Sequence, residues 1–244
     1  MQNNYPLQPD ALGAVESSIT GAHTKGELMP QPYNSFFLVI EGLDGSGKTE
    51  IARRLVERLQ GRVPDRPQSI MFTYEPHDPS FGGELIRQVL RKEMAVSPRT
   101  LALAYAANRA DHLHQVIEPF LSQHQHMVVC DRYYLSSLVY QTTPELPIEY
   151  VMSINAGSRR PDLTLFLNAS AETCYQRMSK RSLTRELFDE RLAELRHQYD
   201  AAIHYLREYG EPIIEINADG TIEEVLAQIE QIALTHFPTW LGYE

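Results

Sequence analysis

The stretch Gly42–Thr49 has the side chains and spacing that most clearly indicate chemistry in this sequence. It fits the pattern G-x-x-x-x-G-K-[ST], follows the apolar run Phe36–Ile40 and precedes a helical pattern. In such a loop, glycines let backbone N–H groups turn toward phosphate oxygens, while the helix N-terminus and Lys48 add positive charge. A glycine-rich turn that binds nothing is the alternative, and the complete set of fixed positions argues against it. The candidate contacts for a nucleoside triphosphate are Gly42, Leu43, Asp44, Gly45, Ser46, Gly47, Lys48 and Thr49.

A carboxylate at the end of an apolar segment is the second candidate for chemistry. Met127–Cys130 is an uninterrupted apolar run, typical of a buried strand, and Asp131 and Arg132 follow it directly. Many phosphate-loop proteins present such a carboxylate to Mg²⁺ or to its water. Because Thr49 would offer its hydroxyl to the same ion, we predict Thr49 and Asp131 as metal ligands.

Five apolar segments alternate with helical patterns and would position these residues. The predicted strands are Phe36–Ile40, Ser69–Thr73, Met127–Cys130, Leu163–Leu167 and Pro212–Asn217. A long helix is predicted to begin at Ser97-Pro98, because serine caps free N–H groups and proline is tolerated in a first turn. A second long helix is predicted over Phe188–Tyr209. This alternation predicts an α/β fold of three layers, a five-stranded parallel sheet covered by helices on both faces, with the site at the carboxyl ends of the strands.

Composition limits the class of partner. The 244 residues suffice for one large domain, assigned to residues 35–244, and the polar stretch 1–34 is predicted to be a flexible extension. A formal charge of −10 disfavours broad binding to nucleic acid or anionic membrane, so the substrate is expected to be small. Cys130 and Cys174 lack metal-ligand spacing and are interpreted as core residues. Without a membrane-length apolar stretch or signal-peptide pattern, we expect a soluble, cytoplasmic protein with no membrane or nucleic-acid partner.

Several stretches, in the same order, resemble the thymidylate kinases, a family of nucleoside-monophosphate kinases with the phosphate-loop NTPase fold. The likeness runs from about Phe36 to about Ile232. It includes the phosphate loop with its internal aspartate, Thr73-x-Glu75-Pro76, Tyr105–Ala110, the block Asp131-Arg132-Tyr133-x-x-Ser136-Ser137-x-x-Tyr140-Gln141, Pro161–Thr164 and Ile222–Val225. The loop aspartate and the Asp-Arg-Tyr block distinguish this family from adenylate kinases and GTPases.

The resemblance implies an enzyme that transfers a phosphoryl group directly from ATP to dTMP, giving dTDP, with Mg²⁺ as cofactor. It also implies a small lid at about residues 180–188, which closes over the ATP phosphates, and a homodimer paired through helices. The helix that begins at Ser97 is the expected contributor to that dimer, although its apolar stripe could equally belong to the core of one chain. No general base is expected, because a phosphate acceptor is already ionised at neutral pH.

Carried over by position, the resemblance also assigns substrate residues. Tyr105 would stack on thymine, Arg109 would lie near base and phosphate, and Arg132 would grip the acceptor phosphate. Ser137 and Gln141 would contact the substrate, and Tyr140 would crowd a 2′-hydroxyl. A core aromatic at Tyr105 and solvated surface charges at the two arginines remain alternatives. The expected catalytic residues are Lys48, Asp44, Arg132 and one of the lid arginines Arg181 and Arg185.

Two positions depart from the family pattern. Glu50 brings negative charge directly behind the phosphate loop, although Arg53 or Arg54 could pair with it on the helix surface. Tyr74 stands where many members have an arginine before Glu-Pro. These departures leave two alternatives open: a kinase for another deoxynucleoside monophosphate, such as a 5-modified pyrimidine, and a catalytically silent nucleotide-binding regulator.

Overall fold

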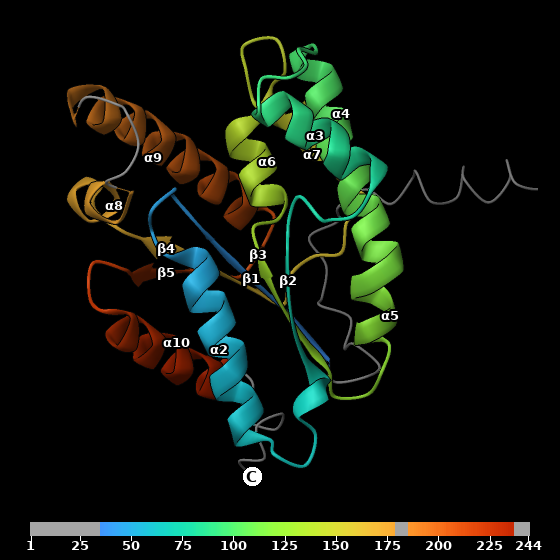
Figure 1. Ribbon diagram of the computed structural model, residues 1–244, viewed down its shortest axis with the longest axis vertical. Coiled ribbons are helices and arrows are strands. Elements are labelled where there is room, and N and C mark those ends of the chain that lie inside the picture. Colours follow the sequence, from blue (N-terminus) through green and yellow to red (C-terminus); the bar gives the residue numbers. More distant parts are fainter. Residues whose placement is uncertain (1–34, 179–184, 237–244) are drawn as a thin grey trace, which may run out of the picture. The chain divides into compact units, whose positions relative to one another are not determined.

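A computed structural model describes residues 35–178 and 185–236, in which five strands form one parallel sheet (Figure 1). The strands are β1 (Phe36–Gly42), β2 (Ile70–Tyr74), β3 (Met127–Asp131), β4 (Leu163–Asn168) and β5 (Ile213–Asn217). Their order across the sheet is β2-β3-β1-β4-β5. The predicted α/β fold is confirmed, and the predicted strands differ from the observed ones only at their ends.

The three central strands are buried along nearly their whole length. Helices cover both faces of the sheet, so apolar residues fill successive positions instead of alternating with polar ones. In the parallel register Ile40 lies beside Asp131, and the Arg132 backbone N–H donates to the Ile40 carbonyl oxygen at 3.0 Å. The phosphate loop and the Asp131-Arg132 pair therefore leave the sheet side by side.

The helices that follow these strands carry the remaining site residues. They are α2 (Lys48–Arg62), α3 (Phe81–Leu90), α4 (Pro98–His112), α5 (Glu118–Leu121), α6 (Tyr134–Tyr140), α7 (Ile148–Ser153), α8 (Ala171–Met178), α9 (Arg185–Glu208) and α10 (Ile222–His236), with a short 3₁₀ turn η1 (Pro67–Ser69) and a π turn η2 (Leu113–Ile117). α2 and α10 pack together on one face of the sheet, and α5, α6 and α9 lie on the other (Figure 1). None of the helices within the described ranges is both long and apolar enough to span a membrane.

The long helix predicted from Ser97 is present but changes pitch. Ser97 caps it as predicted, its hydroxyl accepting from the Thr100 N–H at 3.1 Å. The π turn η2 then precedes Pro119, in the first turn of α5. Proline has no N–H to donate and its ring crowds the carbonyl four residues earlier, which a wider turn accommodates.

Other boundaries differ in places that matter for the site. α9 begins at Arg185, before the predicted Phe188, and α6 was not predicted as a helix. The predicted extension 1–34 lies outside the described ranges, as do residues 237–244 and residues 179–184, which include Arg181 and the first part of the lid predicted at about 180–188. The Arg185 side chain is not described.

Candidate active site

The phosphate loop joins β1 to α2 and depends on glycine at two positions. Gly45 and Gly47 have φ values of 86° and 94°, a left-handed conformation that other residues adopt only with strain. A side chain at Gly45 would also place its Cβ 2.7 Å from the Cys174 carbonyl oxygen. The backbone can therefore close tightly over a ligand only with glycine at these two positions.

Lys48 lies folded against its own loop. Its Nζ donates to the Leu43 carbonyl oxygen at 2.8 Å and lies 4.0 Å from the Asp44 carboxylate, and the side chain is buried. Burial, followed by the nearby charge of Arg132, lowers the pKa of the Lys48 ammonium to about 8. An anion bound in the loop would favour the charged form of this amine.

Thr49 and Asp131 form a pair of oxygen donors beside the loop. The Thr49 hydroxyl donates to Asp131 Oδ2. The second oxygen, Asp131 Oδ1, is buried and has no hydrogen-bond partner among the residues that the structure describes. Mg²⁺ prefers hydroxyl, carboxylate and water oxygens and is usually held by one or two carboxylates together with substrate phosphates. The donor set and the unpaired oxygen therefore fit the predicted ion.

Arg132 reaches the loop from the end of β3 through an unusual backbone conformation. Its φ is 68°, which is uncommon for a residue with a side chain and is found preferentially where the surroundings enforce it. The guanidinium pairs with the Asp44 carboxylate and donates to the Ser136 hydroxyl at 3.0 Å and the Tyr199 hydroxyl at 3.3 Å. These contacts hold Arg132 over the phosphate loop, so the alternative of a freely solvated charge is wrong.

Glu41, which sequence reasoning did not select, joins the loop to the Asp-Arg-Tyr block. Its fully buried carboxylate accepts from the Tyr133 N–H at 2.8 Å, the Ser136 N–H at 3.0 Å and the Ser136 hydroxyl at 2.7 Å. Burial raises the pKa of Glu41. The signal in the sequence was an acidic residue that continues the apolar run Phe36–Ile40, since a carboxylate in a buried strand requires dedicated donors.

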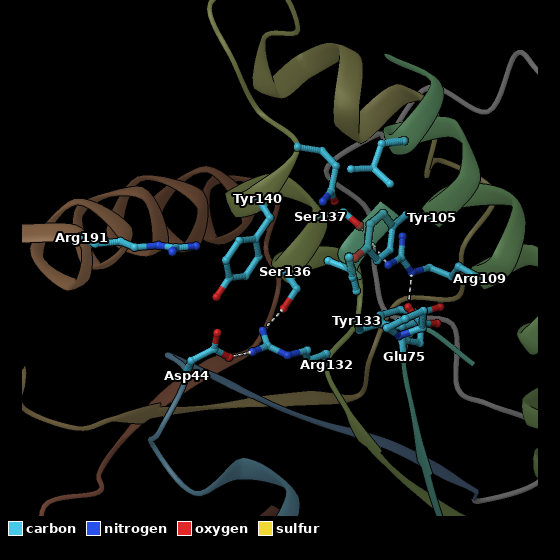
Figure 2. Close-up of a pocket in the computed structure, with 14 residues that line it drawn as sticks. Asp44, Glu75, Tyr105, Arg109, Arg132, Tyr133, Ser136, Ser137, Tyr140 and Arg191 are labelled. Atoms are coloured by element: carbon cyan, nitrogen blue, oxygen red, sulfur yellow. Dashed lines mark hydrogen bonds and ion pairs between the residues drawn. The ribbon is translucent and has the colours of Figure 1, made fainter. Parts of the chain in front are cut away.

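A cavity of about 440 Å³ opens beside the loop and brings all six predicted substrate residues together (Figure 2). Asp44, Arg132, Tyr140 and Arg191 lie at one end, and Tyr105, Arg109 and Ser137 lie toward the other. The full lining is Asp44, Glu75, Pro76, Leu90, Leu101, Tyr105, Arg109, Arg132, Tyr133, Ser136, Ser137, Tyr140, Gln141 and Arg191. Tyr105 therefore faces a cavity rather than only the core.

Arg109 is fixed within the cavity wall and is only 1% exposed. Its Nε donates to Glu75 Oε2 at 2.7 Å, its terminal nitrogens donate to Ser137 Oγ at 3.0 Å and to Asn155 Oδ1, and the guanidinium lies 5.2 Å from the centre of the Tyr133 ring. The alternative of a solvated helix charge is therefore wrong. Asn155 was not predicted, because its sequence neighbours give no sign of this partner.

Arg177 ties the phosphate loop to the segment after β5. It donates to the carbonyl oxygens of Ser46 at 3.0 Å, Ala218 at 3.1 Å and Gly220 at 2.9 Å. In the sequence Arg177 is one of four closely spaced basic residues, with Lys180, Arg181 and Arg185, and this spacing does not indicate its partners. Arg191, on α9, was also missed, because its place beside the cavity depends on how that helix crosses the sheet.

Neither departure from the family pattern lines the cavity. Glu50 is exposed and pairs with Arg54, whose Nε lies 2.6 Å from its carboxylate. Tyr74 is 39% exposed, packs beside Phe72 with ring centres 6.2 Å apart, and does not line the cavity. Neither feature obstructs the loop or the cavity, so the structure gives no support to a silent regulator or a different acceptor.

Comparison with known proteins gives a consistent result. A family model described as thymidylate kinase matches residues 40–229. The probable thymidylate kinase of Pyrococcus abyssi is 35% identical over 195 residues, covering 78% of this chain and 91% of the relative, and that of Pyrococcus horikoshii is 32% identical over 199 residues, covering 80% and 93%. The thymidylate kinase structure from Candida albicans aligns with a TM-score of 0.67 at 23% identity, covering 87% of this chain and 96% of that one. The chain belongs to the thymidylate kinase family.

Proposed function

We propose that this protein transfers the γ-phosphoryl group of ATP to dTMP, giving ADP and dTDP. The observation that carries the proposal is that Asp44, in the phosphate loop, pairs with Arg132 at the end of β3 and that both residues line the cavity. A triphosphate on the loop and a monophosphate in the cavity would therefore meet at these two residues. Direct transfer requires such alignment and charge neutralisation rather than a covalent enzyme intermediate.

The donor half of the proposed site is the loop itself. Residues 42–49 would hold the ATP phosphates through backbone N–H groups, and Lys48 would exchange its bond to the Leu43 carbonyl for phosphate oxygens. Thr49 and Asp131 would hold Mg²⁺, directly or through water. When bound, the ion would neutralise charge on the phosphates being separated. Arg177 would hold the loop in place during this exchange, since it is anchored to the Ser46 carbonyl oxygen.

The acceptor half is the cavity. Tyr105 offers a ring face for a pyrimidine, and Arg109 offers N–H donors suited to a carbonyl oxygen of thymine. Ser137 accepts from Arg109, which leaves its own hydroxyl proton to donate to the base, and Gln141 adds an amide whose Oε1 has no hydrogen-bond partner among the described residues. Tyr140 would lie against the sugar and disfavour a 2′-hydroxyl.

Arg132 would serve both halves. Its pairing with Asp44 and its contacts to Ser136 and Tyr199 aim the guanidinium before any ligand arrives, so little reorganisation would be needed. Lys48 and Arg132 would stabilise charge on the moving phosphoryl group. Arg181 or Arg185 would add a further positive charge from the lid, as the family resemblance implies.

A coupled ADP-release assay with a panel of acceptors tests the proposal. With ATP and Mg²⁺, we expect kcat/KM for dTMP to exceed that for dCMP, dGMP and AMP by at least about tenfold, equivalent to about 1.4 kcal/mol. The ribonucleotide counterpart of dTMP should be a poorer acceptor, and Tyr140→Ala should reduce that preference. Equal rates across the panel, or no ADP release above the ATP-only control, would contradict the proposal.

We further propose a cytoplasmic homodimer, as the family resemblance implies. Leu103, on the predicted pairing helix α4, is 46% exposed, and Phe81 on the adjacent α3 is 87% exposed, which supports an interface on this side. Sedimentation equilibrium should give twice the chain mass, and Leu103→Glu should shift the protein toward a monomer. Cell fractionation tests the location.

A further inference from the structure

Three arginines line the cavity, and two of them are already neutralised. Arg109 is paired with the Glu75 carboxylate at 2.7 Å, and Arg132 is paired with Asp44. Arg191 makes no hydrogen bond or ion pair with any residue that the structure describes. It is therefore the arginine of the cavity whose charge has no carboxylate partner among the residues that the structure describes.

Arg191 lies at the end of the cavity where the phosphates would meet. Figure 2 shows its side chain extending from α9 toward Tyr140, on the side of Asp44 and away from Arg109. The side chain is exposed to solvent, so a ligand could reach it without displacing a partner among the residues that the structure describes. Its position excludes a role at the base end of the cavity.

The helix that carries Arg191 is anchored to the site. Leu192, the next residue, is buried in the core, and two turns further along the Tyr199 hydroxyl donates to the Gly42 carbonyl oxygen at 3.1 Å. α9 also packs against α6, which supplies Ser136 and Tyr140. Arg191 is thus presented by a supported helix rather than by a free loop.

The charge balance at this end calls for another cation. Asp44 and Arg132 together are close to neutral, whereas a nucleoside monophosphate carries almost two negative charges at neutral pH. Tyr74, at the position where many family members have an arginine, supplies no charge and does not line the cavity. An arginine matches a phosphate with two parallel N–H donors, which lysine cannot present.

We propose that Arg191 binds the phosphate of the acceptor nucleotide and determines the preference for a nucleoside monophosphate over the nucleoside. The identity of the nucleotide rests on the proposed function. The role differs from that expected of Arg181 and Arg185, which would act on the ATP phosphates, because Arg191 lines the acceptor cavity itself.

Calorimetric titration of dTMP and thymidine into the full chain without ATP separates a phosphate contact from a structural effect. We expect Arg191→Gln to weaken dTMP binding about tenfold, a modest loss because the arginine is exposed, and to leave thymidine binding within about twofold of wild type. Arg191→Lys should recover part of the loss. The matched control is Arg207→Gln, the same charge change about 24 Å further along α9, where Arg207 donates to the Ile213 carbonyl oxygen. It should bind both ligands like wild type.

The remaining outcomes overturn the assignment in different ways. Unchanged dTMP affinity in Arg191→Gln would show that the residue does not hold the acceptor phosphate. An equal loss for dTMP and thymidine would assign it a structural role. If the wild-type protein binds neither dTMP nor thymidine, the proposed function fails and the inference fails with it. If wild type and Arg191→Gln both bind dTMP tightly, only the role of Arg191 is wrong.

Discussion

Replacement of Arg109 by methionine should destabilise the fold strongly, because the buried Glu75 carboxylate would lose its arginine partner and keep only the contact with His112. Glu75 and Arg109 are 6% and 1% exposed, and their charged atoms lie 2.7 Å apart. Methionine keeps much of the aliphatic volume, so the main loss is electrostatic. The hydrogen bonds to Ser137 and Asn155 would be lost as well.

The size of the effect follows from the cost of breaking a buried pair. Removing one partner costs about 3–5 kcal/mol, a large share of the roughly 5–15 kcal/mol that stabilises a domain. Glu75→Gln combined with Arg109→Met removes the buried negative charge, and the amide can still bond His112, whose Nδ1 lies 3.3 Å from the Glu75 carboxylate. The double variant should therefore recover at least about 2 kcal/mol relative to the sum of the single losses.

Urea unfolding at neutral pH, followed by circular dichroism, measures the free energy of unfolding of Arg109→Met, Glu75→Gln and the double variant. Arg99→Met is the control: it lies on the same helix, α4, and its exposed guanidinium contacts only the Tyr150 ring, at 5.0 Å, among the interactions described. The control should change the free energy of unfolding by no more than about 1 kcal/mol. If Arg109→Met loses no more than the control, or if the losses at Glu75 and Arg109 simply add, the buried pair does not have the role assigned to it.

Three further predictions concern the donor half. The pKa of Lys48 is lowered to about 8, and bound phosphates should raise it, so MgATP binding at pH 8 should take up about half a proton and should weaken as the pH rises further. Binding enthalpies in buffers of different ionisation enthalpy measure the proton uptake, and an uptake of zero would contradict the prediction. Asp131→Asn should raise the Mg²⁺ concentration that gives half-maximal rate about tenfold, and Thr49→Val should raise it to a smaller extent. If neither variant changes the dependence of the rate on Mg²⁺, Asp131 and Thr49 are not metal ligands. Glu50→Gln should change KM for ATP by less than about twofold, since Arg54 already neutralises Glu50, and a large fall in KM would show that its charge repels ATP.

Local features of the chain were sufficient to predict the fold. Buried parallel strands have a continuous apolar pattern, as in β3 and β4. The Gly42–Thr49 loop has glycines that its backbone conformation requires, followed by a lysine and a threonine whose side chains suit phosphate and metal binding. The change from α-helical to π-helical pitch at η2 was not predicted, because a regular apolar pattern continues through it. Helix α6 was not predicted because it lies within the Asp-Arg-Tyr block, whose residue types suit contacts with the site as much as helix formation.

Long-range partners explain what sequence reasoning missed at the site. Arg109 meets Glu75 across 34 positions and Asn155 across 46, so neither its burial nor its bonds can be read from neighbouring residues. Glu41 likewise accepts from Tyr133 and Ser136, more than 90 positions away. The family resemblance compensated for this, because it supplied the order of motifs that the fold brings together.

A single-turnover reaction with ATP labelled in its γ-phosphate is the most direct test that loop and cavity form one phosphotransfer site. Enzyme in excess over dTMP should move the label into the β-phosphate of dTDP, with no more free labelled phosphate than in a sample without dTMP. Arg132→Gln should slow this transfer by at least about a hundredfold while the protein stays folded. Label released mainly as inorganic phosphate, or left in ATP when both substrates are bound, would show that the two halves do not work as one active site.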